Sequence, residues 1–379
     1  MLKWIEIDLG IITENVRIIR RSLLPGVKFI AAVKSNGYGH GAFEASMAAL
    51  RGGADMLAVL TSEEGASLRT ALDNASSEFK GAKIMLLAPS LPEEAPSIVK
   101  NNLIPCADSA GFIASLDNAA EYPYPCNIEI DMGMGRWGIA KEALIPFIES
   151  IKKYRNVHIA GISTHIGYKP PENMTDAEEK LRAFSAMQKD ASSYLGRKIE
   201  AYAANSAVFC DISGSQFDAV RIGNLMYGIY PTDIYQKRRQ GPPLPGLRRP
   251  WQMYAKIISI KEIRKGQKLG YNSEFTAPRD MRIATIPAGY GDGLTMEPME
   301  YKIRISSGFR YWGMIGSKKA YFICRPGISH ILLDITDIPE AAIGTKVALH
   351  VRRTSANILI PRVYKGQKNT EDSKAKKKK

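Results

Sequence analysis

A lysine directly follows the first apolar run of the chain. Lys34 continues residues 29–33 and opens the segment KSNGYGHG, residues 34–41. Burial at the end of such a run lowers the pKa of a lysine, which leaves a neutral amine able to form a Schiff base. A lysine at a strand end more often extends into solvent. Here three glycines around Tyr38 and His40 favour instead a turn that lets the backbone approach a ligand closely.

Four later apolar runs also end in side chains that suit a charged ligand. Arg136 follows the glycine-rich turn DMGMG, and a guanidinium there suits a carboxylate or a phenolate-type oxygen. His165 ends the next run. Ser206, with the helix N-terminus that follows it, suits a phosphate, and Arg221 ends the last run. With Lys34, these residues predict a site for a phosphate-bearing aldehyde cofactor and a carboxylate substrate.

The five residues fall at regular places in an alternation of strand-like and helix-like segments. One helix start is marked by the capping-box sequence TSEE at residues 61–64. This alternation predicts an α/β fold, a TIM-type (β/α)8 barrel rather than an open doubly wound sheet, with its active site at the carboxyl ends of the strands. Eight short apolar runs carry the prediction: 29–33, 56–60, 83–87, 103–107, 127–132, 159–164, 200–204 and 218–223.

A connection rich in proline and glycine ends the alternation. Its prolines exclude a continuous helix. The runs beyond it are short, rich in Ile and Tyr and bounded by turns, which predicts a β-rich C-terminal domain: 252–260, 281–287, 302–306, 319–324, 330–335 and 346–351. We expect five parts: a strand at 1–8 that joins the β-rich domain, the barrel at 9–232, the connection at 233–250, the β-rich domain at 251–365 and a disordered lysine-rich tail at 366–379.

Composition and motifs exclude several classes of protein. The chain has 379 residues, of which 45% are hydrophobic, as in soluble globular proteins. No apolar run reaches the roughly 18–20 residues of a membrane-spanning helix. Glu6 and Asp8 lie where a secretory signal would need an apolar core, so we expect a cytoplasmic protein without membrane association. The four scattered cysteines and five histidines show no ligand spacing, and we expect neither a disulfide framework nor a metal site.

The net charge of +14 is compatible with nucleic-acid binding. Residues 365–379 hold seven lysines and two acidic residues and so contribute +5 of that charge. Such a tail is usually solvated and adds a weak, salt-sensitive attraction to anions. The sequence contains no basic helix with interleaved aromatic residues, so we expect no specific nucleic-acid partner.

The chain resembles the alanine racemase family, the barrel-type pyridoxal-phosphate enzymes. The resemblance runs from IEIDL at residues 5–9 to PRVY at residues 361–364, and AVKSNGYGHG at residues 32–41 resembles the cofactor-lysine signature of the family. It implies that Lys34 carries pyridoxal 5'-phosphate covalently and acts as the base on one face of the substrate α-carbon. Tyr271, in the segment LGYN, matches the second base on the opposite face, and racemisation needs both.

The same resemblance assigns roles to the other candidate residues. Arg221 faces the cofactor's ring nitrogen, and His165 and Arg221 supply the positive charge that lowers the pKa of Tyr271. The substrate is bound by Arg136. The site is completed across a homodimer, so that Tyr271 serves the cofactor of the partner subunit. The phosphate is held by Tyr38, Ser206, Tyr364 and the backbone of Gly223 and Asn224, and the entrance is lined by Tyr290.

Two positions depart from the family pattern. Glu129 stands where many members carry a carbamylated lysine, and we expect its fixed negative charge to form an ion pair with Arg136. A Cys-Met-Asp-Gln segment of the family is also missing. An ungapped alignment places Ile328 at the methionine, whose backbone N–H binds the substrate carboxylate, whereas an alignment on Cys324 places Pro326 at the aspartate. The aspartate is absent under either alignment.

Several functions stay open at this point. Racemisation of alanine, which supplies D-alanine for cell-wall peptides, is the leading hypothesis, and serine or another small amino acid is an alternative substrate. Decarboxylases that share the architecture carry a glycine-rich phosphate loop late in the barrel, which is not found here. A non-catalytic cofactor carrier of the single-domain barrel type would lack both the second domain and Tyr271.

Overall fold

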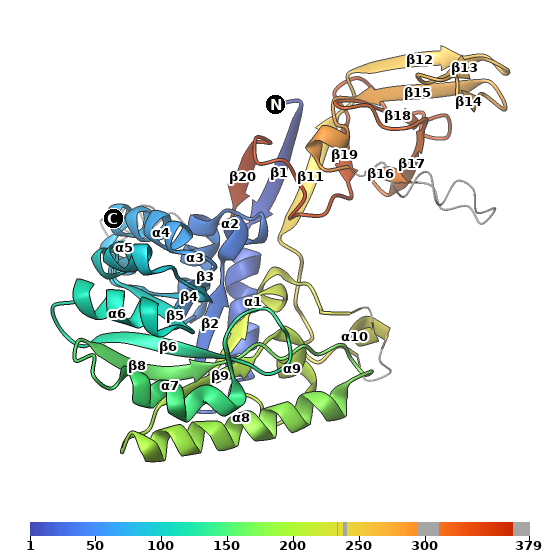
Figure 1. Ribbon diagram of the computed structural model, residues 1–379. Coiled ribbons are helices and arrows are strands. Elements are labelled where there is room, and N and C mark those ends of the chain that lie inside the picture. The colour runs from blue at the N-terminus through green and yellow to red at the C-terminus, as the bar shows by residue number, and fades with distance from the viewer. Residues whose placement is uncertain (233, 238–240, 295–310, 367–379) are drawn as a thin grey trace, which may run out of the picture. The chain divides into compact units, whose positions relative to one another are not determined.

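The computed structural model describes residues 1–232, 234–237, 241–294 and 311–366 (Figure 1). The chain divides into two compact units, one formed by Leu9–Arg249 and the other by Met1–Asp8 with Pro250–Lys379. The strand predicted at 302–306 and the tail predicted at 366–379, apart from Gly366, lie outside the described residues.

Parallel strands close into a barrel in the unit Leu9–Arg249. Their order is β5-β4-β3-β2-β10-β9-β8-β6, and pairing of β5 with β6 closes the ring. The short β7 (Ile139–Ala140) adds to the edge of β6. The predicted (β/α)8 barrel is thereby confirmed, and each of the eight apolar runs corresponds to one strand: β2 (Lys28–Ala32), β3 (Met56–Val59), β4 (Lys83–Pro89), β5 (Leu103–Ala107), β6 (Tyr124–Asp131), β8 (Val157–Ser163), β9 (Glu200–Ala204) and β10 (Ala219–Ile222).

Helices cover the outside of this barrel (Figure 1). In α1 (Leu9–Arg21), Leu9, Ile12, Val16 and Ile19 are buried, the spacing of a helix with one apolar face. The longer helices are α3 (Ala42–Gly52), α4 (Ser62–Ala75), α6 (Ala110–Ala119), α7 (Leu144–Ile151) and α8 (Met174–Tyr194). The shorter ones are α2 (Lys34–Tyr38), α5 (Ala95–Lys100), α9 (Ser206–Asp211), α10 (Ile234–Lys237) and the 3-10 turns η1 (Ser77–Phe79), η2 (Pro92–Glu94), η3 (Lys141–Ala143) and η4 (Asn224–Tyr227).

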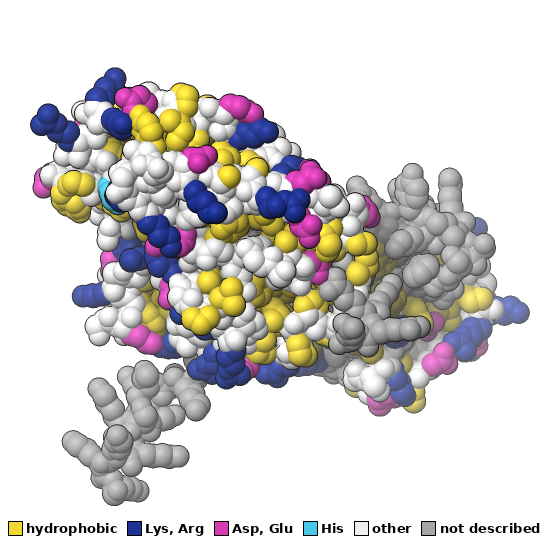
Figure 2. Space-filling view, turned by 90° about the horizontal axis from the view of Figure 1, so that it is seen from below, with side chains coloured by type: hydrophobic (Ala, Val, Ile, Leu, Met, Phe, Trp, Pro, Cys, Tyr) yellow, Lys and Arg dark blue, Asp and Glu magenta, His cyan; other side chains and the backbone are white. Residues whose placement is uncertain are grey.

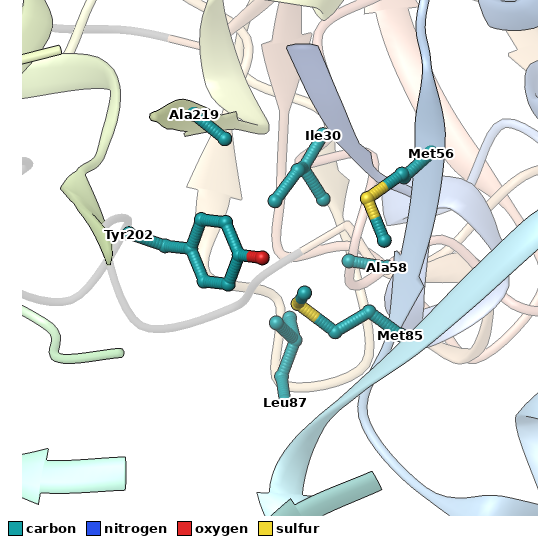
Figure 3. Close-up of a cluster of buried hydrophobic side chains, with 7 residues drawn as sticks. All are labelled: Ile30, Met56, Ala58, Met85, Leu87, Tyr202 and Ala219. Atoms are coloured by element: carbon teal, nitrogen blue, oxygen red, sulfur yellow. The ribbon is translucent and has the colours of Figure 1, made fainter. Parts of the chain in front are cut away.

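Side chains fill the interior of the barrel. Tyr202 extends from β9 into a cluster of apolar side chains (Figure 3), and its hydroxyl donates to the Glu200 carboxylate. Because the interior is a packed core, a ligand site has to lie at the ends of the strands. The cluster consists of Ile30, Met56, Ala58, Met85, Leu87, Tyr202 and Ala219.

The other unit is built on one mixed sheet in the order β12-β15-β18-β17-β16-β19-β11-β1-β20. Its β1 (Lys3–Asp8) pairs antiparallel with β11 (Trp251–Lys256) and parallel with β20 (Arg362–Lys365). The structure confirms the prediction that the C-terminal domain is β-rich. The remaining strands are β12 (Ser259–Ile263), β15 (Met281–Ile286), β16 (Trp312–Ile315), β17 (Lys318–Ile323), β18 (Ile331–Asp334) and β19 (Lys346–Leu349), with a separate pair β13 (Lys268–Leu269) and β14 (Phe275–Thr276).

The predicted strands of this unit differ in extent from the observed ones, and two of them show a physical reason. The run predicted at 252–260 is divided into β11 and β12, because the backbone N–H groups of Ile257 and Ile258 donate to different partners, Thr345 and Thr285. The run predicted at 319–324 ends one residue earlier, because Cys324 adopts a left-handed conformation with φ 60°.

The surface carries charges of both signs. On the face shown in Figure 2, Lys and Arg side chains are interspersed with Asp and Glu. Within the described residues, no helix combines the length and the apolar character that crossing a membrane requires.

Candidate active site

One cavity gathers most of the predicted site residues at the carboxyl ends of the barrel strands. It has a volume of about 390 Å³, within the usual range for small-molecule sites. Trp137, Met134 and Asn205 also line it. The predicted residues in its lining are Lys34, Tyr38, Arg136, His165, Ser206, Arg221, Gly223 and Asn224.

Lys34 enters the cavity from a backbone of unusual conformation. It follows β2, and the next four residues, Ser35, Asn36, Gly37 and Tyr38, all have positive φ. Burial lowers the pKa of Lys34, and the positive charges of Arg136 and Arg221 lower it further. Both effects favour the neutral amine.

A stack of aromatic rings supports this turn. His40 stacks on Tyr227 with ring centroids 4.2 Å apart, and Tyr38 lies 5.3 Å from the same ring. The Tyr38 hydroxyl packs against the backbone at Gly223, where a Cβ atom would lie 2.6 Å from the hydroxyl oxygen. Position 223 therefore has to be glycine for Tyr38 to hold this place.

The residue before Ser206 caps the helix that follows it. Asn205 caps α9, because its side-chain oxygen accepts the backbone N–H groups of Ala207 at 2.9 Å and Val208 at 3.2 Å. Its amide nitrogen donates to the carbonyl of Ile166 at 2.8 Å. These two backbone N–H groups are used by the cap, and the phosphate-binding role of Ser206 and the helix N-terminus remains a prediction.

Arg221 and His165 line the cavity together with Lys34 and Arg136. The buried Arg221 donates from Nη2 to the carbonyl of Thr164 at 3.0 Å. Burial, followed by the charges of Arg221, Arg136 and Lys34, lowers the pKa of His165 to about 3. The imidazole is therefore neutral near pH 7, which does not favour a positive charge at this residue, and the effect predicted for His165 on Tyr271 remains a prediction.

Glu129 is buried inside the barrel but does not form the expected ion pair. Its carboxylate accepts a hydrogen bond from Ser163, and only 2% of the residue is exposed. Burial raises the pKa of Glu129, while Arg221, the Ser163 hydroxyl and Arg136 oppose that shift. No ion pair within 4.0 Å joins Glu129 and Arg136, both of which the structure describes, although the charge of Glu129 opposes the lowering of the pKa of Arg136 that burial causes. The guanidinium lies over the ring of Trp137.

The turn before Arg136 is held by Asp131. The Asp131 carboxylate accepts the backbone N–H groups of Gly133 at 2.8 Å, Met134 at 2.7 Å and Gly135 at 3.0 Å. Burial acts in the opposite direction, but these hydrogen bonds lower the pKa of Asp131 and keep it ionised. The turn presents Arg136 at the cavity.

Four predicted site residues belong to the other unit. Tyr271 is 86% exposed, and its ring centroid lies 6.4 Å from that of His330. The N–H of Tyr290 donates to Gly327 at 3.0 Å, and the N–H of Gly291 donates to the carbonyl of Ile328 at 2.9 Å, so these two segments are joined. Tyr364 lies in β20, opposite Ile7. The roles predicted for Tyr271, Tyr290, Ile328 and Tyr364 remain predictions.

Comparison with known families decides the relationship. Residues 7–231 match the family described as alanine racemase, N-terminal domain, and residues 251–368 match alanine racemase, C-terminal domain. The chain belongs to the alanine racemase family. An alanine racemase of Nostoc sp. is 30% identical over 352 residues, 91% of this chain and 86% of that protein. One of Desulfovibrio desulfuricans is 27% identical over 350 residues, 91% of this chain and 88% of that protein.

Solved structures share the fold. An alanine racemase of Bacillus anthracis with bound L-Ala-P has a TM-score of 0.82 at 25% identity, covering 97% of this chain and 96% of that one. The alanine racemase of Clostridium difficile 630 also has a TM-score of 0.82, at 22% identity and 96% coverage of both chains. The predicted membership of the alanine racemase family, a family of pyridoxal-phosphate-dependent isomerases, is thereby confirmed.

The residues around the cavity fit the cofactor for which the alanine racemase family is known. An aldehyde requires an amine, and Lys34 has a lowered pKa at the cavity wall. A phosphate requires hydroxyl and N–H donors close to small residues, and the cavity presents Tyr38, Ser206 and the glycine backbone at 223. Arg221 adds a buried guanidinium.

Sequence reasoning missed three residues that shape this alanine racemase site. Trp137 packs against Arg136, Asn205 caps α9, and Tyr227 carries the stacked rings of Tyr38 and His40. The asparagine directly before a helix was a detectable cap signal. The aromatic contacts of Trp137 and Tyr227 left no signal in residue spacing.

Proposed function

We propose that this protein interconverts L- and D-alanine with pyridoxal 5'-phosphate bound to Lys34. The observation that carries the proposal is the Lys34 amine in one cavity with Arg136 and Arg221, where burial and both guanidiniums lower its pKa. A neutral amine can bind an aldehyde and can accept a proton near pH 7.

The chain supplies binding and proton transfer around the cofactor. When bound, pyridoxal phosphate withdraws electrons from the substrate α-carbon and makes its proton removable. Lys34 Nζ moves that proton on one face. Arg221 would donate to the ring nitrogen and, because a guanidinium keeps its proton, would leave that nitrogen unprotonated. The phosphate is held by Tyr38, Ser206, Tyr364 and the backbone of Gly223 and Asn224.

The hydroxyl of Tyr271 is the second group that transfers a proton in this proposal. Racemisation requires a proton to be returned on the face opposite to the one it left. We propose that the protein is a homodimer in which Tyr271 completes the site of the partner subunit. Tyr271 is 86% exposed within a single chain, so its hydroxyl is accessible for this role.

Arg136 and the backbone N–H of Ile328 bind the substrate carboxylate in this proposal, and Tyr290 lines the entrance. Serine is a second candidate substrate, because the segment at residues 327–330 lacks the family's methionine and aspartate. The proposed role is cytoplasmic production of D-alanine for cell-wall peptides.

The direct test of the proposal is Lys34→Ala. We expect this variant to lose both the visible absorbance of the lysine-bound cofactor and alanine racemisation. Lys141→Ala, which removes an exposed lysine of the same unit, is the matched control and should keep both. Normal turnover by Lys34→Ala would refute the assignment.

A further inference from the structure

The turn that carries Lys34 needs support from its surroundings. Ser35 has φ 52° and ψ 53°, Asn36 has φ 52° and ψ 49°, and Tyr38 has φ 54°. These values lie in the left-handed region, which is sterically unfavourable for residues with a Cβ atom and is seldom occupied by several such residues in succession. Surrounding contacts therefore have to hold this backbone.

A carboxylate from another element meets the turn at its first peptide. Glu64, in the first turn of α4, accepts the backbone N–H of Ser35 at Oε1 over 2.7 Å. Its Oε2 accepts the backbone N–H of Leu60, just after β3, also over 2.7 Å. One side chain thus joins the backbone that follows Lys34 to the end of the neighbouring strand.

This arrangement differs from the one that the sequence predicts. In a capping box, the glutamate would accept the N–H of Thr61, the residue that caps α4. Thr61 does accept the N–H of Glu64, at 3.4 Å, but the Glu64 carboxylate is directed to Leu60 and Ser35 instead. The two carboxylate oxygens of Glu64 therefore bind backbone N–H groups outside α4 rather than the N–H of the residue that caps it.

We propose that Glu64 is a positioning residue for Lys34, which holds the left-handed turn by accepting the Ser35 and Leu60 N–H groups and so fixes the amine in the cofactor cavity. This inference rests on the proposed function. Asn36 and His40 add bonds within the turn itself, to the N–H of Ala42 at 2.9 Å and to the carbonyl of Gly37 at 2.9 Å. The charge of Glu64 also acts on the amine itself, because it opposes the lowering of the pKa of Lys34 that burial, Arg136 and Arg221 cause.

Replacement by glutamine tests the two hydrogen bonds at nearly constant shape. A glutamine side chain has one acceptor oxygen, and its amide group would present N–H donors to the second backbone N–H. Glu63→Gln is the matched control, because Glu63 is exposed in the same helix turn and accepts neither the Ser35 nor the Leu60 N–H. Both variants remove one negative charge near the start of α4, so the effect on the helix dipole is the same.

The first measurement is amide hydrogen exchange in the protein without cofactor. We expect Glu64→Gln to raise exchange at Ser35 and Leu60 by about tenfold, with the rest of the barrel unchanged, because a hydrogen bond to a charged group is lost. Glu63→Gln should exchange like the wild type. Unchanged exchange at these two amides, or faster exchange throughout the barrel, would overturn the proposal. The measurement needs no turnover, so it is independent of whether the wild type racemises alanine.

The second measurement is a titration with pyridoxal phosphate. We expect the dissociation constant to rise about tenfold in Glu64→Gln and to stay unchanged in Glu63→Gln. Adding Ser35→Gly to Glu64→Gln should recover about fivefold, because glycine adopts the left-handed conformation without steric cost. A role of Glu64 limited to stabilising α4 would not be relieved by a backbone change in the turn that follows Lys34. Equal affinity in the two single glutamine variants, or no recovery with Ser35→Gly, would contradict the proposal.

Discussion

The guanidinium carbon of Arg136 lies 3.7 Å from the centroid of the Trp137 ring. A stacked guanidinium is attracted by the ring's electron density and keeps its plane parallel to a rigid surface. The neighbouring residue therefore orients Arg136, while Glu129 bonds to Ser163 below it. Arg136 is therefore positioned by an aromatic neighbour rather than by an ion pair with Glu129.

Trp137→Leu removes that ring and should weaken substrate binding. An exposed cation–π contact contributes about 1 kcal/mol, so we expect KM for alanine to rise about fivefold with a smaller change in kcat. Trp137→Phe keeps an aromatic face and should retain most of the affinity. Steady-state kinetics of the two variants provide the check. An unchanged KM in Trp137→Leu would show that Arg136 is held by other contacts.

Gly223→Ala should damage the cofactor site by steric conflict alone. Its added Cβ would lie 2.6 Å from the Tyr38 hydroxyl oxygen, which has to move away. We expect the affinity for pyridoxal phosphate to fall by about tenfold or more, because overpacking costs about 1–3 kcal/mol. Gly111→Ala is the control, since nothing lies within 4 Å of the Cβ it adds. Equal cofactor affinity in both variants would contradict the tight packing of Tyr38 on residue 223.

His165 should make the fold sensitive to acid. The unfolded chain takes up a proton at this residue near pH 6.5, whereas burial and the nearby cations delay uptake in the folded chain to about pH 3. The free energy of unfolding therefore falls as pH decreases from 6.5 towards 3, by up to about 1.4 kcal/mol for each pH unit. Between these limits the unfolded state binds more protons.

His165→Gln removes this titration and should flatten the acid limb of the stability curve. The free energy of unfolding is measured by denaturant unfolding of the protein without cofactor, at a series of pH values between 7 and 4. His158→Gln, in the strand β8 that precedes His165, should keep most of the acid sensitivity, because burial and Arg197 lower the pKa of His158 less. An acid limb as steep in His165→Gln as in the wild type would show that other groups cause it.

The barrel could be predicted because its signal is local. Each strand is a short apolar run, and a charged side chain near its end, such as Lys34 after β2 or Arg221 within β10, marks the end that carries the site. Strands of the other unit were harder to predict, because β20 pairs with β1 from the opposite end of the chain. That pairing is a long-range property which a four-residue segment does not reveal.

The sequence predicts which residues form the candidate site better than it predicts the contacts that they make. Residue type and place in the alternation brought Lys34, Tyr38 and His165 into one group, as the cavity does. The partners of Glu64 and Arg136 depend on how turns from separate strands meet, and spacing along the sequence carries no information on that. The protonation state of His165 depends on burial among cations, which exists only after folding.

The central claim is removal and return of the α-proton on opposite faces of alanine. The most direct test is incubation of the protein with pyridoxal phosphate and pure L-alanine in deuterated buffer, followed by proton NMR and chiral chromatography. We predict that D-alanine appears and carries deuterium at its α-carbon. Absence of exchange with bound cofactor, or exchange without any D-alanine, would contradict the claim.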